Sequence, residues 1–413
     1  MKPMPMSGQA TAFWRRASVT SAAFFALLAA SVPSGFALGS DDRGSPTPHT
    51  VGPAPKEPSI AVPYQAEQLW RQGITGKGST VAVLVSFGDR RIEEFMAEYD
   101  RQYNLPPADI RRVEPVGKVP SCTDSGVNTE NCHAWESETR LDVAMIHTLA
   151  PEARIVIAAI PVDETQGETG MPEMMRALDH LTERRLADVV SMSFGSPEEN
   201  FRDPRSIPGY GRAFDRADHA GMTLVASSGD HGPTGPLRDR PERHHRHRTV
   251  AWPASDPRVT AVGGVQLHVD ADGHRTSPDT LWPKSGAGHS SHFARPAWQS
   301  PTPGTGSAYG RSIPDITMQG AAGTSQSAPL FAGVLALAVQ LHHGRLGNVN
   351  PALYKLGSQG SAAGIVDVTE GDDSYGGVPG FTAEPGFDTA SGWGTVDVPK
   401  FARALADARS LHE

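Results

Sequence analysis

The sequence predicts an α/β protein with a doubly wound, mostly parallel sheet that carries helices on both faces. Short apolar segments alternate with segments of helical periodicity, which is the rhythm of βαβ units. The first apolar segment, Thr80 to Val85, is continuous, as expected for a strand buried on both faces. With 413 residues, 38% of them hydrophobic, the chain is long enough for one large globular unit, or two at most.

The remaining elements follow in order along the chain. They are a helix over 91–103, a strand over 153–160, a helix near 171–185, and strands over 188–193 and 222–227 with a helix between them. Sites in such sheets form at the carboxyl ends of the strands. Two of these ends continue into polar, glycine-containing loops, at 193–196 and 227–232.

The N-terminal segment, residues 1–37, has the pattern of a signal peptide. Basic residues up to Arg16 precede an apolar stretch at 22–30 and a small-residue cleavage pattern at Gly35-Phe36-Ala37. An uncleaved anchor is the alternative, but the apolar stretch is shorter than the roughly 20 residues that span a bilayer. We therefore expect a secreted, extracellular protein, and no later segment is expected to span a membrane.

Composition sets the domain limits and excludes some partners. Residues 38–57 are rich in proline and polar residues and are interpreted as a linker, which leaves 58–407 as the folded domain. The net charge of −9 argues against nucleic-acid binding. We expect no membrane association after signal removal, and a monomer.

The two cysteines, Cys122 and Cys132, lie close together in a polar segment. In an exported chain a disulfide between them is expected, with two free thiols as the alternative. His244, His245 and His247 form the densest histidine group, for which a solvated loop is preferred over a metal site.

The segment Gly323-Thr324-Ser325 leads into a long apolar run and predicts a serine at the start of a helix. Backbone N–H groups at a helix start are free to stabilise an oxyanion. A serine hydroxyl is a weak nucleophile and needs a base. The sequence contains no His-Gly-Thr segment to supply a histidine in the usual way.

A carboxylate pair is the alternative base. Glu138 and Asp142 lie four residues apart on a segment of helical pattern, so both fall on one face. Taken alone, the pair is better explained by a solvated acidic helix face. Beside a serine, two adjacent carboxyls form a base that still works in acid, where histidine is fully protonated. Asp230, in the 227–232 loop, fits the same chemistry, because a neutral carboxyl donates a hydrogen bond to an oxyanion.

These motifs together resemble those of the sedolisins, the serine-carboxyl peptidases. The matching pieces are Glu138-x-x-Leu141-Asp142, Ser228-Gly229-Asp230 and Gly323-Thr324-Ser325-x-x-Ala328-Pro329, in the family's order. The resemblance implies a subtilisin-like fold and an acid-active endopeptidase or tripeptidyl-peptidase acting on proteins or peptides. It also implies the roles: Ser325 as nucleophile, Glu138 as base, Asp142 as the group that orients Glu138, and Asp230 as oxyanion acid.

The resemblance further implies one Ca²⁺ ion near the C-terminus. Its expected ligands are the Asp367 and Asp388 carboxylates and the carbonyl oxygens of Val368, Glu384 and Gly386. Oxygen ligands from glycine-rich turns suit Ca²⁺. The alternative is that the two aspartates cap turns.

The sequence departs from the family pattern in three ways. A linker stands where the family's large folded prosegment is expected, and the segment between Asp315 and Gly323 is short. Val85 and Phe194 are apolar where several members have glutamate and tryptophan. Two other interpretations therefore stay open: a weak or inactive relative that acts as a binding module, and a neutral-pH hydrolase that uses His231 or His147.

Overall fold

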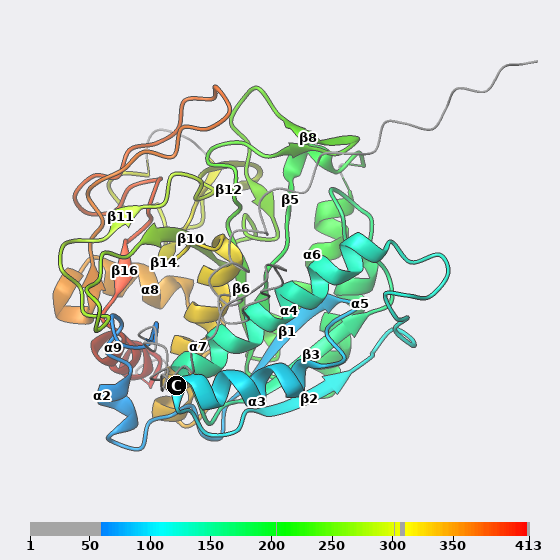
Figure 1. The fold of residues 1–413 in the computed structure, drawn as a ribbon. Coiled ribbons are helices and arrows are strands. Elements are labelled where there is room, and N and C mark those ends of the chain that lie inside the picture. The colour runs from blue at the N-terminus through cyan, green and yellow to red at the C-terminus, as the bar shows by residue number, and fades with distance from the viewer. Residues whose placement is uncertain (1–58, 204, 301, 306–309, 411–413) are drawn as a thin grey trace, which may run out of the picture. The chain divides into compact units, whose positions relative to one another are not determined.

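A computed structural model describes residues 59–410 except 204, 301 and 306–309. The predicted signal peptide and the predicted linker lie outside the described residues. Within them, an eight-stranded sheet has the order β11-β10-β6-β4-β1-β3-β2, with β14 paired to β10 (Figure 1). Its strands are β1 (Thr80–Ser86), β2 (Asp109–Val113), β3 (Arg154–Ile160), β4 (Val189–Met192), β6 (Thr223–Ser227), β10 (Val259–Gln266), β11 (Thr280–Leu281) and β14 (Ile316–Gln319).

The pairing of this sheet confirms the predicted fold class. Every pair is parallel except β10 with β11. The predicted strands over 80–85, 153–160, 188–193 and 222–227 become β1, β3, β4 and β6, with ends within one residue of the prediction. β1 is buried along nearly its whole length, because strands lie on both sides of it and helices cover its faces.

Helices cover both faces of the sheet (Figure 1). α4 and α7 pack against each other on one face, and α5 and α6 pack together on the other. The helices are α2 (Glu67–Trp70), α3 (Ile92–Tyr103), α4 (Thr129–Leu149), α5 (Met171–Glu183), α6 (Ser206–His219), α7 (Thr324–His342), α8 (Asn350–Gly357) and α9 (Val398–Ser410).

Four two-stranded sheets and two short 3₁₀ segments complete the described part of the chain. The small strands are β5 (Ser196–Pro197), β7 (Pro236–Leu237), β8 (Arg240–His244), β9 (Ala251–Trp252), β12 (Gly288–Ala294), β13 (Gly310–Ile313), β15 (Ile365–Val366) and β16 (Thr395–Val396). The pairs are β12 with β13, β15 with β16, β5 with β9 and β7 with β8.

Helix α7 is the central helix of the core. It contacts α4 and α9 as well as β1, β4, β6, β10 and β14. By length and composition it is apolar enough to cross a membrane, contrary to the expectation that no later segment would be. However, 83% of its apolar window is buried inside the protein. Its hydrophobicity is therefore accounted for by its place between the sheet and the neighbouring helices.

A disulfide fixes the start of α4. Cys132 lies in the first turn of this helix and bonds to Cys122 in the preceding loop, with 5.4 Å between their Cα atoms. Asn128 caps the same end, since its side chain accepts a hydrogen bond from the Asn131 backbone N–H. The predicted disulfide is thus confirmed, and α4 begins from an anchored loop.

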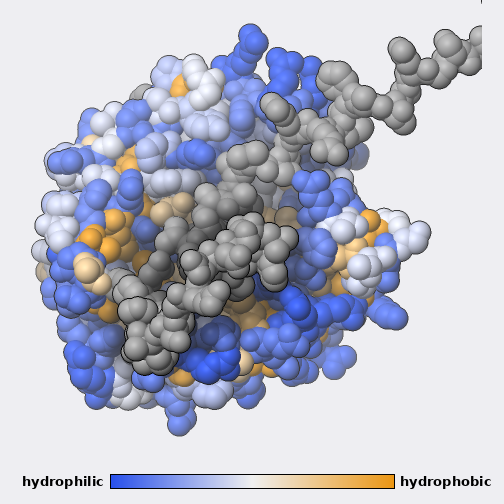
Figure 2. Space-filling view, in the orientation of Figure 1, coloured by the Kyte–Doolittle hydropathy of each residue, from blue (hydrophilic) through white to orange (hydrophobic). Residues whose placement is uncertain are grey.

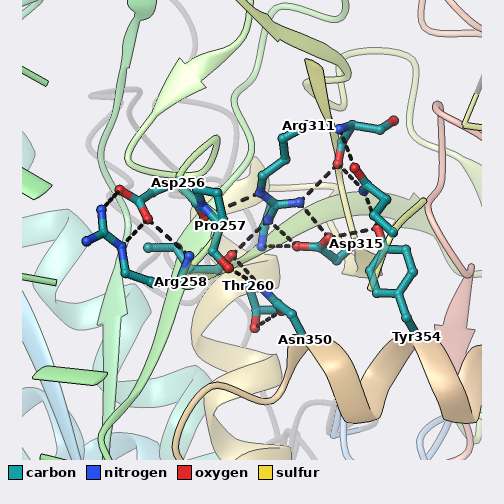
Figure 3. A network of polar contacts seen from close by, with 12 residues as sticks. Asp256, Pro257, Arg258, Thr260, Arg311, Asp315, Asn350 and Tyr354 are labelled. Carbon is teal, nitrogen blue, oxygen red and sulfur yellow. Dashed lines mark hydrogen bonds and ion pairs between the residues drawn. The ribbon is translucent and has the colours of Figure 1, made fainter. Parts of the chain in front are cut away.

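A buried polar network holds the strand that leads to α7 (Figure 3). Arg311, in β13, is fully buried, and its guanidinium donates to both carboxylate oxygens of Asp315 at 2.9 and 2.6 Å. The Tyr354 hydroxyl of α8 donates to the same carboxylate at 2.9 Å. Asp315 also accepts from the Ala261 N–H of β10. This network ties β13, β10 and α8 to the start of β14.

The visible face of the molecule is mainly hydrophilic around its rim, with apolar residues between (Figure 2). Among the described residues, Val269 is the one large hydrophobic residue classed as exposed, at 41%.

Candidate active site

The predicted nucleophile Ser325 lies in the first turn of α7. Gly323 precedes the helix with φ +97°, and a Cβ atom at this position would lie 2.7 Å from the Asp230 Oδ2 atom. A glycine is therefore required there on both counts. Among the described residues, no hydrogen bond is formed by the Ser325 backbone N–H, so this donor faces the site with the positive end of the helix dipole.

Helix α4 presents the predicted carboxylate pair to Ser325. The Glu138 carboxyl lies close enough to the Ser325 and Ser193 side chains for both to lower its pKa. Asp142, one turn further along α4, is fully buried. Glu138 keeps some exposed surface, but its Oε1 atom is buried and has no hydrogen-bond partner. The structure thus places Glu138 against the nucleophile and Asp142 behind it.

Burial dominates the electrostatics of this pair. It raises the pKa of Glu138, as does the nearby Asp230 carboxylate, whereas the Ser325 and Ser193 hydrogen bonds lower it. Burial, followed by the charge of Glu138, also raises the pKa of Asp142. Two like charges in a dry site cannot both ionise easily, so the pair retains a proton well above the usual carboxyl range.

Ser193 is a site residue that the sequence reasoning did not assign. It follows β4 directly, and its Oγ atom donates to Asp142 Oδ1 at 2.6 Å. The same Oγ atom lies 3.4 Å from the Ser325 carbonyl oxygen. The available signal was its position at the carboxyl end of a parallel strand, where polar residues commonly form sites.

Asp230 reaches the nucleophile from the loop after β6. Its Oδ1 atom accepts two hydrogen bonds from Thr324, one from the backbone N–H at 2.8 Å and one from the hydroxyl at 2.7 Å. The Oδ2 atom faces Gly323. Burial raises the pKa of Asp230, while the Thr324 hydrogen bonds and Lys284 lower it. Because Oδ1 is engaged by Thr324, a proton on Asp230 would be carried by Oδ2, the oxygen that lies against Gly323.

The two histidines considered as alternative bases are engaged elsewhere. His147 lies about two and a half turns beyond Glu138, on the opposite side of α4. It is fully buried, with its Nε2 atom 3.0 Å from the Pro106 carbonyl and 3.1 Å from Asp100 Oδ1. The His231 ring packs against His244 and Tyr375. Burial lowers the pKa of His231 to about 4, with help from His244 and Lys284. No contact among the described residues joins either histidine to Ser325.

The side-chain groupings give no support to a histidine metal site. Among the described residues, the one cluster of three or more His, Cys, Asp or Glu side chains close enough to share an ion is Cys122, His133 and Glu136. The Cys122 sulfur is already bonded in the disulfide, so this group lacks a thiolate. His245 instead contacts the Asn200 side chain at 3.2 Å.

The two predicted calcium carboxylates, Asp367 and Asp388, both accept hydrogen bonds from backbone N–H groups of the 384–388 loop. Asp367 Oδ2 accepts from the Gly386 N–H at 2.8 Å, and Asp388 Oδ2 accepts from the Glu384 N–H at 3.0 Å. Within the described part of the chain, no hydrogen bond ends on the carbonyl oxygens of Glu384 or Gly386. Two carboxylates and two open carbonyls on neighbouring turns form a donor set that fits a hard cation.

Comparison with known structures supports the fold. Pseudomonas sedolisin, solved as a complex with two molecules of pseudo-iodotyrostatin, superposes with a TM-score of 0.70 at 23% identity. The match covers 86% of this chain and 99% of that one. The sheet, and the serine at the start of its central helix, define a subtilisin-like α/β protein.

Sequence comparison adds the family. A model described as the subtilase family matches residues 125–358. The chain therefore belongs to the subtilase family.

Three curated relatives illustrate the match. Kumamolisin from Bacillus sp. (strain MN-32) is 28% identical over 387 residues, which cover 86% of this chain and 65% of that protein. Sedolisin from Pseudomonas sp. (strain 101) is 28% identical over 57% of this chain and 44% of its own. Tripeptidyl-peptidase 1 from Canis lupus familiaris is 31% identical over 54% of this chain and 44% of its own. The chain thus matches between 44% and 65% of the length of these relatives.

Proposed function

We propose that this chain is a secreted serine-carboxyl peptidase that hydrolyses peptide bonds in acid. The observation that carries the proposal is the position of Glu138 beside Ser325, close enough for the serine hydroxyl to lower the pKa of the Glu138 carboxyl, while no histidine among the described residues contacts the serine. The kumamolisin and sedolisin relatives support the same chemistry. Proteins or peptides are the proposed substrates.

In the proposed acylation, Ser325 Oγ attacks the carbonyl carbon of the scissile bond. Its proton passes to the ionised Glu138, whose position is held with the help of Asp142. The carbonyl oxygen becomes an oxyanion that accepts hydrogen bonds from the Ser325 N–H and from the neutral Asp230 carboxyl. When the carbon–nitrogen bond breaks, Glu138 returns its proton to the leaving amine. Water then attacks the acyl-enzyme by the same steps and regenerates Ser325.

This mechanism requires Glu138 to be ionised while Asp230 is protonated. The active form of Glu138 and Asp230 together holds one proton. Activity therefore falls at low pH, where both groups are protonated, and falls at high pH, where both are ionised. Because the pKa values of both groups are raised, the profile is a bell centred above the ordinary carboxyl range of about 4.

We also propose one Ca²⁺ ion held by Asp367, Asp388 and the carbonyls of Val368, Glu384 and Gly386. The two open carbonyls and the converging carboxylates support this site. When bound, the ion would neutralise the two aspartates and cross-link the 367–368 and 384–388 loops. Its role is structural, because these loops supply none of the groups that act on Ser325.

The direct test is hydrolysis of a denatured protein between pH 3 and pH 7 by the wild-type chain and by Ser325→Ala. We expect acid-dependent cleavage by the wild type alone. Equal cleavage by both, or none by the wild type, would contradict the proposal. Mass spectrometry of the products distinguishes internal cleavage from release of N-terminal tripeptides.

A further inference from the structure

Ser193 offers one hydroxyl to three acceptors of the candidate site. Its Oγ atom is 2.6 Å from Asp142 Oδ1 and 3.4 Å from the Ser325 carbonyl oxygen, and it lies close enough to the Glu138 carboxyl to lower the pKa of that group. No direct hydrogen bond between Glu138 and Asp142 is present among the described residues, whereas the Ser193 hydroxyl bonds to Asp142 and acts on the pKa of both carboxyls. This hydroxyl is therefore placed to bridge the two carboxyls.

The third acceptor, the Ser325 carbonyl, is available because of Pro329. In a regular helix the N–H four residues further on would bond to this carbonyl, but proline has no N–H. Pro329 lies inside α7 at that position. The Ser193 hydroxyl is thus placed where it contacts the backbone of the nucleophile as well as both carboxyls.

A count of hydrogens limits how this cluster is protonated. A serine hydroxyl has one proton to donate and can accept in return. Ionised carboxylates and a carbonyl only accept, so a single hydroxyl cannot bond to both carboxylates when both are ionised. The two contacts are satisfied together when one carboxyl is neutral and donates to Ser193 Oγ. The geometry therefore suits a pair that shares one proton.

We propose that Ser193 is a positioning residue of the peptidase reaction, whose hydroxyl bridges Glu138 and Asp142 and holds Glu138 in its basic form toward Ser325. The inference rests on the proposed function of this site. The charged groups that act on Glu138 and Asp142 are the two carboxyls themselves and Asp230 from the loop after β6. No cation among the described residues is found to offset them, which leaves hydroxyl donors to stabilise the ionised form.

Ser193→Ala is the first test variant. Losing a donor to an ionised group raises the pKa of Glu138, by about one unit for a typical charge-assisted hydrogen bond. The pH optimum lies between the pKa values of Glu138 and Asp230. Raising the pKa of Glu138 therefore moves the optimum upward, whichever of the two groups has the higher pKa. We expect that upward shift, together with a fall in kcat of about tenfold and little change in KM.

Ser191→Ala is the matched control. Ser191 lies two residues earlier in β4, is equally buried, and its hydroxyl has no hydrogen-bond partner. This variant should keep the wild-type optimum. If Ser193→Ala does not fold, Ser193→Cys replaces it, because a thiol is a weaker donor of similar shape and should shift the optimum in the same direction.

The pH–activity profile of the wild type distinguishes failure of the proposed peptidase function from failure of the bridging role of Ser193. Absence of acid-dependent, Ser325-dependent activity in the wild type would overturn the proposed function. An active wild type with an unchanged optimum in the folded Ser193 variant would overturn the bridging role alone. Infrared titration of the Glu138 carboxyl, assigned by difference from Glu138→Gln, gives a readout without turnover. An unshifted midpoint in Ser193→Ala would likewise overturn the bridging role.

Discussion

Thr324 donates twice to one oxygen of Asp230. Its backbone N–H and its hydroxyl reach Oδ1 at 2.8 and 2.7 Å, and the hydroxyl also accepts from the Gly229 N–H at 3.1 Å. With Oδ1 occupied in this way, Oδ2 is the oxygen that can carry a proton toward the reacting carbonyl. The residue before the nucleophile therefore fixes the orientation of the predicted oxyanion acid.

Asp230→Asn should keep a donor in this position at every pH. The amide oxygen can replace Oδ1 as acceptor from Thr324, and the amide nitrogen can replace the protonated Oδ2. We expect residual activity whose alkaline limb has disappeared, because the group that lost its proton there is gone. The pH dependence of kcat/KM checks this outcome.

Asp230→Ala is the control for that experiment. It removes the donor altogether and should lose about 10²- to 10³-fold in kcat. An unchanged alkaline limb in Asp230→Asn would contradict the role assigned to Asp230.

Gly323→Ala should abolish activity while leaving most of the fold intact. The new Cβ atom would meet Asp230 Oδ2 at 2.7 Å, in a backbone conformation that L-residues rarely adopt. We expect a loss of at least about 10²-fold in kcat, since a displacement of 1 Å at a reacting group has that effect. Peptide hydrolysis at the optimum, together with circular dichroism, measures both properties.

Gly209→Ala is the matched glycine control. Gly209 lies in α6, and the nearest atom to its added Cβ is an arginine side-chain nitrogen at 4.0 Å. It should have wild-type activity. If Gly323→Ala were as active as Gly209→Ala, the close packing of Gly323 against Asp230 described here would be contradicted.

The Arg311–Asp315 pair should matter for stability far more than an exposed pair. Arg311→Met leaves a buried carboxylate without its cation and should lower the free energy of unfolding by about 3–5 kcal/mol. Arg202, whose ion pair with Asp239 is mostly exposed, provides the comparison. Arg202→Met should change stability by less than about 1 kcal/mol. Urea unfolding of both variants measures the difference, and equal effects would contradict the structural role of the network.

Calcium removal should destabilise the chain. An ion that binds only the folded state at 100 times its Kd contributes about 2.7 kcal/mol, so a chelator should lower the midpoint of thermal unfolding and added Ca²⁺ should restore it. Asp388→Asn should remove this response. Glu370→Gln, an exposed neighbour outside the proposed ligand set, should keep it. If neither the chelator nor added Ca²⁺ changes the midpoint of thermal unfolding, the proposed calcium site is wrong.

Local pattern predicted the sheet and its helices because each element has its own signal. β1 and β3 are buried on both faces and so have continuous apolar sequences, and the Gly323 turn marks the start of α7. Glu138 and Asp142 could be paired because they lie on one helix face.

Contacts between distant segments were not available from pattern. Ser193 and Asp142 are 51 residues apart in sequence, and Ser193 and Ser325 are 132 apart, so only the folded sheet shows that one hydroxyl reaches both. The buried Arg311 network was missed for the same reason, since an arginine is usually exposed and its partners come from separate elements.

The central claim is that Glu138 activates Ser325. Covalent labelling with a fluorophosphonate probe, followed across pH and located by peptide mapping, tests it most directly. We predict labelling of Ser325 with a bell-shaped pH dependence, slowed at least about 10²-fold by Glu138→Gln. Glu136→Gln, on a different face of α4 where it contacts His133, should label like the wild type. Failure to label Ser325, or equal rates for Glu138→Gln and the wild type, would contradict the account.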